Sequence, residues 1–254
     1  MTLKEKLKKN YPTFGSWITI GHSSIVEIMA SAGFEWLTID MEHSAIDIAK
    51  AQELITVIQA NGLEALVRVS KNEEVIIKRV LDAGADGVIV PMIKNAVDAQ
   101  QAVDYVKYPP MGKRGVGLAR AQKYGIGFEE YKEWQKDGTI IIAQIEHIDS
   151  VQNIDSIVLT SGIDGIIVGP FDLSASMGMP GEYERDEVKS ALKHIEERCI
   201  TLNKSLGFHV ISPNFMDMVA KLNAGYTFLA FSLDFYYLGN MAREQMELLK
   251  NYLK

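Results

Sequence analysis

The chain has 254 residues, which suits one large α/β domain, and 47% of them are hydrophobic, enough to bury a sizeable core. The formal net charge of −7 argues against nucleic acid as a partner, because phosphate binding needs a clustered basic surface. The single cysteine, Cys199, excludes an internal disulfide. No apolar run is long enough for a membrane span and no signal peptide is recognisable, so we expect a cytoplasmic protein.

Strand-like and helix-like segments alternate along the chain after a short charged helix, expected over Thr2–Lys9. Apolar runs rich in β-branched residues predict eight strands, at Phe14–Ile20, Trp36–Glu42, Glu64–Ser70, Gly87–Met92, Thr139–Glu146, Gly165–Gly169, Ser205–Val210 and Tyr226–Ser232. Helical patterns fill the gaps, at Ser24–Ala32, Ile46–Ala60, Glu73–Ala83, Ala96–Val106, Ser150–Leu159, Asp186–Leu202, Asn214–Leu222 and Leu238–Tyr252. Eight strands that are each followed by a helix predict a (β/α)8 TIM barrel, one domain over residues 1–254.

An open, doubly wound parallel sheet is the alternative fold. Such a sheet usually has fewer strands and carries a glycine-rich phosphate turn after the first one. Here the turn after the first strand is Ile20-Gly-His-Ser-Ser24, which lacks the G-x-G-x-x-G pattern. The barrel is therefore favoured.

One connection, from Tyr108 to Gly138, is unusually long. It contains Pro109-Pro110 and five glycines before Phe128, followed by a polar, helix-like piece. Loops of this length in a compact domain are usually functional or contact a partner, although a plain surface excursion is the other interpretation. Within the connection, Arg120 and Tyr124 are candidates for contributing to the site or to an interface.

Polar side chains gather at the carboxyl ends of the predicted strands, where a barrel enzyme carries its site. Because side chains alternate along a strand, Asp40 and Glu42 share one face of the second strand, and Gln144 and Glu146 share one face of the fifth. If these faces line the lumen, one rim collects Asp40, Glu42, His43, Arg68, Gln144, Glu146 and Asp172.

The sixth strand stops abruptly at Gly169-Pro170, and Asp172 follows at once. Proline ends strand pairing, so this arrangement delivers a carboxylate to the loop after the strand. The other interpretation is an ordinary strand-to-helix turn in which Asp172 caps the helix.

Four carboxylates at one rim face a single arginine, and buried charges are costly unless they are paired or bind an ion. A divalent cation would neutralise the excess, whereas partial exposure with Arg68 pairing one acid is the alternative. Glu146 and Asp172 are hard oxygen ligands. With the remaining positions left to water and substrate, they suit Mg²⁺ or Mn²⁺ better than a closed zinc site.

Five motifs, in this order along the chain, resemble the HpcH/HpaI aldolase family. They are Ile39-Asp-Met-Glu-His43, Arg68, Tyr108-Pro-Pro-Met-Gly-Lys-Arg-Gly115, Gln144-Ile-Glu146 and Gly169-Pro-Phe-Asp-Leu-Ser174. The resemblance covers almost the whole chain. It implies a class II, metal-dependent aldolase that reversibly cleaves a 4-hydroxy-2-oxo acid to pyruvate and an aldehyde.

By that resemblance Glu146 and Asp172 would bind the divalent cation, Mg²⁺ or Mn²⁺ with Co²⁺ as a further candidate. Pyruvate would chelate this cation. Gln144 would touch the substrate oxygens, and backbone N–H groups near Phe171 and Asp172 would hold the carboxylate. Arg68 would stabilise the enolate oxygen.

The resemblance further implies that His43 transfers protons and that Asp82 orients it, with Asp40 and Glu42 behind them. It also implies a homo-oligomer, often a hexamer, with the last helix and the long loop at subunit contacts. The apolar residues of Leu238–Tyr252 are nevertheless enough to pack that helix on its own barrel.

Two residues depart from the family pattern: Phe171 stands where a small residue is common, and His209 has no family role. A hydrogen-bonded structural histidine is the expectation for His209.

Other functions stay open. A Schiff-base aldolase needs a lysine on an inner strand face, and the nearest lysines, Lys71 and Lys94, lie just past strands. A phosphosugar enzyme would carry glycine-rich loops after strands seven and eight, which are missing here. The remaining alternatives are a CoA-ester lyase related to the citrate lyase β-subunit and a barrel that binds a metal and a keto acid without turnover.

Overall fold

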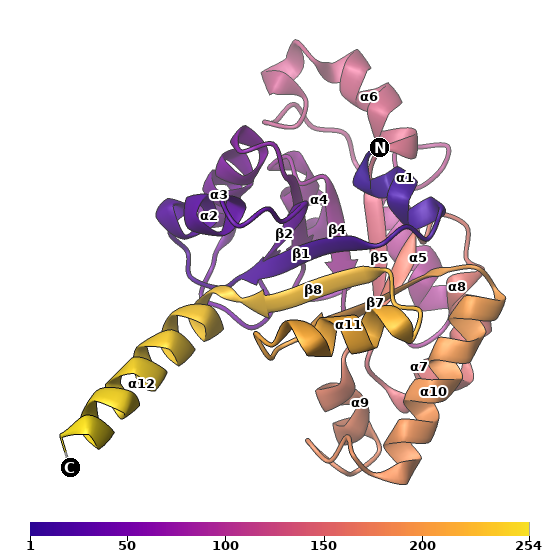
Figure 1. Cartoon of the computed structure of the whole chain (residues 1–254). Helices are drawn as coiled ribbons and strands as arrows, with labels where there is room; N and C mark the ends of the chain where they lie inside the picture. Colours follow the sequence, from indigo (N-terminus) through magenta and orange to yellow (C-terminus); the bar gives the residue numbers. More distant parts are fainter. Residues whose placement is uncertain (254) are drawn as a thin grey trace.

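The computed structural model describes residues 1–253, and its eight parallel strands close into one barrel (Figure 1). Neighbouring strands pair in chain order, and β1 completes the ring by pairing with β8. The strands are β1 Thr13–Ile18, β2 Trp36–Asp40, β3 Glu64–Arg68, β4 Gly87–Val90, β5 Ile140–Ile145, β6 Gly165–Val168, β7 Ser205–Val210 and β8 Phe228–Leu233. The predicted TIM barrel is confirmed.

Helices alternate with the strands. They are α1 Leu3–Lys8, α2 Ser23–Ala30, α3 Ile48–Ala60, α4 Glu74–Asp82, α5 Ala96–Val106, α6 Phe128–Asp137, α7 Ile148–Gln152, α8 Ile154–Val158, α9 Pro170–Ser176, α10 Asp186–Thr201, α11 Phe215–Asn223 and α12 Asp234–Tyr252, with a 3₁₀ turn η1 at Lys123–Gly125. The helix expected over Ser150–Leu159 is interrupted at Asn153 and forms α7 and α8. The segment after Gly169, expected to be a loop, is the short helix α9.

Large side chains fill the barrel lumen. Trp36 and Phe228 are completely buried and stack with ring centroids 4.3 Å apart. Gly15 on β1 makes room for them, because a Cβ atom there would lie 2.1 Å from the indole of Trp36. The part of the lumen near the amino ends of the strands is therefore a packed core, as in other barrels of this kind.

Helix α1 closes the amino end of the barrel. Its Leu3 and Leu7 are buried in the same cluster as the lumen residues. The Nζ of Lys4 donates hydrogen bonds of 2.7 Å to the carbonyl of Thr139 and to the carboxylate of Asp164, which attaches the helix to β5 and to the turn before β6. This plug leaves the carboxyl end of the barrel as the accessible one.

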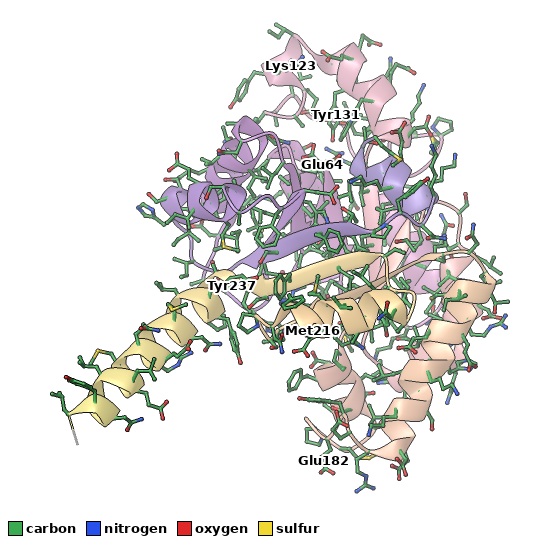
Figure 2. The ribbon with its side chains drawn as sticks, viewed as in Figure 1. Glu64, Lys123, Tyr131, Glu182, Met216 and Tyr237 are labelled. Carbon is green, nitrogen blue, oxygen red and sulfur yellow. The ribbon has the colours of Figure 1, made fainter. Side chains whose placement is uncertain are left out.

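Helix α12 runs away from the barrel, so it does not pack on its own barrel, the alternative that its apolar residues left open (Figure 1). Asp234, at its start, accepts hydrogen bonds from the N–H and hydroxyl groups of Thr19 and the N–H of Ile20, which anchors the first turn. Beyond that turn no other helix or strand of residues 1–253 covers its side chains (Figure 2). The exposed apolar residues of α12 and its end are Phe235, Leu238, Met241, Met246, Leu248, Leu249, Tyr252 and Leu253.

Among residues 1–253, no helix combines the length and the apolar character that a membrane span requires.

Candidate active site

An ion pair between Asp40 and Arg68 lies at the carboxyl end of the barrel. The two residues are register partners at the ends of β2 and β3. Nε of Arg68 donates to Oδ1 of Asp40 over 3.0 Å, and Nη2 donates to Oδ2 over 2.6 Å. Such a two-pronged contact fixes the plane of the guanidinium group as well as its position.

The same carboxylate also holds the loop after β2. Oδ1 of Asp40 accepts the backbone N–H groups of Glu42 at 3.0 Å and of His43 at 3.1 Å, while the hydroxyl of Ser44 donates to the Asp40 carbonyl. Burial favours the neutral acid, but Arg68 and the two backbone donors outweigh burial and hold the pKa of Asp40 below its usual value. Asp40 is therefore an ionised anchor for both Arg68 and His43.

Glu42 lies beside these two residues, in a position where the negative charge of its carboxylate is unfavourable. Its Oε2 is 3.4 Å from Nε of Arg68 and 3.8 Å from Nε2 of His43. Within residues 1–253 no hydrogen bond reaches this buried oxygen. Burial raises the pKa of Glu42 to about 7; Arg68 opposes the rise, and the carboxylates of Glu146, Asp40 and Asp172 add to it.

Glu146 follows β5 and is nearly inaccessible, at 3% exposure. Its Oε1 accepts the backbone N–H of Met92 over 2.7 Å, and its other oxygen accepts the amide of Gln144, so the two residues meet as their shared strand face predicts. Met92 adopts a left-handed backbone (φ 56°), a costly conformation that is typical of functional sites. Burial raises the pKa of Glu146, although both hydrogen bonds oppose this. At Gly169 a Cβ atom would lie 3.1 Å from the Glu146 carboxylate, so a glycine lets β6 pass close by.

Asp172 lies in the first turn of α9, with Pro170 as the first helical residue. The helix is capped by Gly169, so Asp172 is neither a loop residue nor the cap. Proline suits this position because the N–H of the first helical residue has no hydrogen-bond acceptor within its own helix. The charge of Asp172 adds to the raised pKa of both Glu146 and Glu42, so the three carboxylates lie within electrostatic range of one another. Its neighbour Phe171 is exposed and lies edge-on to Tyr183.

This group of side chains suits a divalent cation. Within residues 1–253 no three His, Cys, Asp or Glu side chains are close enough to form a complete metal cage. Glu146 and Asp172 offer hard oxygen donors, and Oε2 of the neighbouring Glu42 accepts no hydrogen bond within residues 1–253. Mg²⁺ typically takes one or two carboxylates and leaves its other positions to water and substrate. The residues present therefore fit such a cation.

Asp82 is not next to His43, and the expected pairing does not occur within one chain. Asp82 is the last residue of α4 and lies near the amino ends of the strands, whereas His43 follows the carboxyl end of β2. Its Oδ1 accepts a 2.6 Å hydrogen bond from Arg114, whose side chain is fully buried and also donates to the hydroxyl of Tyr131. Asp82 thus ties the long loop to α4.

Other residues of the long loop are also away from the rim. Arg120 donates to the carbonyl of Ala83 and to Gln59, next to the end of α4. Tyr124 is 73% exposed in a left-handed backbone conformation. Within one chain neither of them belongs to the site.

Trp17 on β1 belongs to the site, and sequence reasoning missed it. The Cζ of Arg68 lies 4.4 Å from the centre of its ring, and the ring of His209 stacks on it at 5.0 Å with an interplanar angle of 9°. The alternation of β1, which places Gly15 and Trp17 on the lumen side, is the signal that could have identified it. An eight-stranded barrel that carries an arginine, a histidine and several carboxylates at its open end has the layout of a TIM-barrel enzyme.

Comparison with known proteins agrees with this class. The model of the family described as HpcH/HpaI aldolase/citrate lyase matches residues 13–238. The hydroxypyruvate/pyruvate aldolase of Roseobacter denitrificans is 33% identical over 243 residues, covering 95% of this chain and 94% of the relative. The 4-hydroxy-2-oxo-heptane-1,7-dioate aldolase of Salmonella typhimurium is 36% identical over 235 residues, covering 91% and 88%. The crystal structure of a family protein from Burkholderia cenocepacia J2315 has a TM-score of 0.92 at 30% identity and covers 98% of both chains.

This chain therefore belongs to the HpcH/HpaI aldolase/citrate lyase family.

The Asp82–Arg114 pair predicts a large loss of stability on Asp82→Ala. Removing one member of a buried pair leaves an uncompensated charge and typically costs about 3–5 kcal/mol of the free energy of unfolding. Asp104→Ala is the control, because its partner Lys113 is 78% exposed and such surface pairs contribute about 0–1 kcal/mol. Urea unfolding measures both variants, and a similar, small loss in each would contradict the structural role of Asp82.

The raised pKa of Glu42 predicts a pH dependence of stability in protein freed of divalent ions. The folded pKa of about 7 lies above the usual value of 4.5, so between these values the folded state binds more protons. Raising the pH from about 5 to 8 should therefore destabilise wild type relative to Glu42→Gln by about 1–3 kcal/mol. Thermal unfolding at several pH values measures the difference, and Glu53→Gln, an exposed change on α3, is the control. A difference that does not vary with pH would refute the prediction.

Proposed function

We propose that this chain is a divalent-metal-dependent aldolase that reversibly cleaves a 4-hydroxy-2-oxo acid to pyruvate and an aldehyde. The observation that carries the proposal is Arg68, fixed by Asp40 beside two carboxylates suited to a cation. The two named relatives, one an aldolase of hydroxypyruvate and pyruvate and the other of a 4-hydroxy-2-oxo diacid, support the same chemistry.

Glu146 and Asp172 would hold the cation, which supplies positive charge for the carboxylate and keto oxygens of the oxo acid. The amide of Gln144 lies next to Glu146 and would touch the same oxygens. The backbone N–H groups of Phe171 and Asp172 are in the first turn of α9, where they have no acceptor within the helix, and would hold the substrate carboxylate. Together these groups orient the oxo acid toward Arg68.

Cleavage begins with removal of the proton from the C4 hydroxyl, which we assign to His43. Its side chain is 64% exposed at the barrel mouth, so a substrate can reach it, and the carboxyl group behind it within this chain is Glu42. As the C4–O bond becomes a carbonyl, the C3–C4 bond breaks and its electron pair forms the enolate of pyruvate. The aldehyde leaves, and C3 then takes up a proton, so the reaction has no net proton change.

Arg68 would stabilise the negative charge that develops on the enolate oxygen. Its guanidinium is held from one side by Asp40 and lies against the ring of Trp17, so no reorganisation is needed as the charge forms. A Schiff-base mechanism has less support, because Lys71 and Lys94 lie beyond the ends of β3 and β4 and none of the strands within residues 1–253 contains a lysine.

We also propose a homo-oligomer, for which a hexamer is the expectation, in the cytoplasm. The unpartnered apolar side chains of α12 and the exposed residues of the long loop support self-association. Within one chain the length of the barrel separates Asp82 from His43, so these two residues can meet only between two copies.

The proposal predicts pyruvate release from a racemic 4-hydroxy-2-oxo acid, followed through lactate dehydrogenase. EDTA should abolish the activity, and Mg²⁺, Mn²⁺ or Co²⁺ should restore it. Activity that resists EDTA and is lost on borohydride treatment would instead establish a Schiff-base lysine. Absence of turnover with every ion would refute the aldolase and favour the CoA-ester lyase or a binding-only barrel.

Arg68→Ala should lower kcat by about 10²–10³-fold, because it removes a charge that acts where the enolate forms. A matched control is Arg79→Ala, an exposed change in the last turn of α4, which should leave kcat unchanged. Circular dichroism checks that both variants are folded. Turnover of a folded Arg68→Ala protein within a fewfold of wild type would remove Arg68 from the mechanism.

A further inference from the structure

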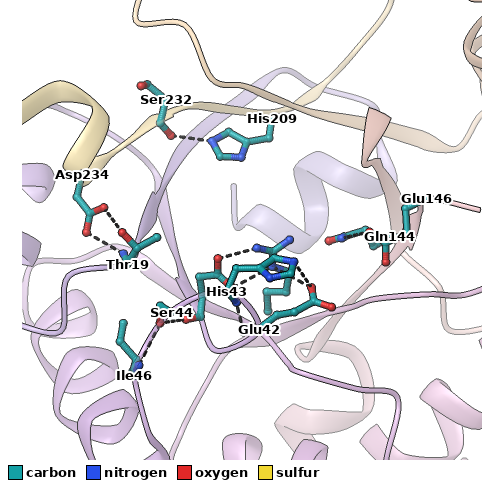
Figure 3. A network of polar contacts seen from close by, with 12 residues as sticks. Thr19, Glu42, His43, Ser44, Ile46, Gln144, Glu146, His209, Ser232 and Asp234 are labelled. Carbon is teal, nitrogen blue, oxygen red and sulfur yellow. Dashed lines mark hydrogen bonds and ion pairs between the residues drawn. The ribbon is translucent and has the colours of Figure 1, made fainter. Parts of the chain in front are cut away.

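His209 projects from β7 into the upper lumen and is held there by one hydrogen bond. Its Nε2 lies 2.9 Å from the carbonyl oxygen of Ser232 (Figure 3). Ser232 has a left-handed backbone (φ 49°) at a point where the pairing of β1 with β8 shifts register. This bulge directs its carbonyl to the histidine ring, a common use of bulges near active sites.

The partner of Nε2 decides what the other ring nitrogen can do. A carbonyl oxygen only accepts hydrogen bonds, so Nε2 carries the hydrogen. Burial lowers the pKa of His209 to about 4, which leaves the ring neutral and Nδ1 with a free lone pair. Among residues 1–253 no hydrogen bond to Nδ1 is formed, and the residue as a whole is half-buried. His209 is next to the last residue of β7, at the end of the barrel opposite to the one that α1 closes.

Trp17 adds an unpartnered donor to this acceptor. Its Nε1–H is buried and forms no hydrogen bond with residues 1–253, and the residue as a whole is 3% exposed. The indole stacks on His209 at 5.0 Å and lies 4.4 Å from the Cζ of Arg68. An unsatisfied buried donor typically costs about 1–3 kcal/mol, so its presence beside a catalytic group needs a reason.

A free acceptor and a free donor on adjacent stacked rings are complementary to a hydroxyl group, which donates and accepts at once. We propose that Trp17 and His209 recognise a substrate hydroxyl on the carbon next to a reacting carbonyl. The inference rests on the proposed function and deepens it. Two substrates carry such a group: a donor such as hydroxypyruvate in place of pyruvate, and a 2-hydroxyaldehyde in place of a simple aldehyde.

Aldol addition with two donors and two acceptors tests the inference. It distinguishes recognition of a hydroxyl group on the donor from recognition of one on the acceptor aldehyde. Pyruvate or hydroxypyruvate is combined with propanal or 2-hydroxypropanal in the presence of Mg²⁺ or Mn²⁺, and kcat/KM is measured for each pair. In wild type the hydroxylated partner should be favoured over its deoxy analogue by about tenfold, in the donor comparison or in the acceptor comparison.

His209→Phe keeps a ring to stack on Trp17 but removes the acceptor. It should abolish the preference, with pyruvate and propanal still turned over within a fewfold of wild type. Trp17→Phe removes the donor and should lower the same ratio, which keeps the test decisive where one variant fails to fold. The matched control is His194→Phe, the same change at an exposed position on the outer helix α10, and it should leave every ratio unaltered.

Three results would overturn the inference. Wild type without preference in either comparison would do so, as would ratios that survive both substitutions. Equal loss with hydroxylated and deoxy substrates would show that the two rings only support Arg68. Absence of addition with all four pairs would instead remove the proposed function, and the hydroxyl site with it.

Discussion

The ion pair of Asp40 with Arg68 is the contact on which the carboxyl end of this barrel depends. One carboxylate holds the guanidinium group by two hydrogen bonds and accepts two N–H groups of the following loop. The carboxylate of Asp40 therefore fixes the position of the Arg68 guanidinium, which would face an enolate, and the position of the loop that carries His43. Because the two strands are in register at this point, closure of the barrel positions the pair without any long flexible segment.

The residues around this ion pair adopt charge states and backbone conformations that lower the stability of the fold, and folding alone does not require them. Glu42 and Glu146 have raised pKa values because they are buried near each other and near Asp172. Met92 and Ser232 adopt left-handed backbones to place an N–H on Glu146 and a carbonyl on His209. Backbone strain and perturbed pKa values of this kind are concentrated at functional sites.

Much of the fold and part of the site could be predicted from the chain. Alternation along β2 and β5 placed Asp40 with Glu42 and Gln144 with Glu146, since side chains on a strand have a period of two. Direction in space could not be predicted in this way. Asp82 precedes β4 closely in sequence, but the end of α4 places it at the opposite end of the barrel from His43. The carboxylate of Asp172 was expected in a loop, although Pro170 is favoured as a first helical residue and begins α9 there.

The sequence by itself determined the order of strands and helices, the faces that line the lumen and the set of polar residues at the rim, because these depend on local periodicity. Only the tertiary structure decided which side chains meet. Arg114 meets Asp82 near the amino ends of the strands, and Trp17 meets His209 and Arg68 near the carboxyl ends. It also decided that α12 leaves the barrel. These contacts join strands and loops far apart in the chain, and the register at which the barrel closes is a property of all eight strands together.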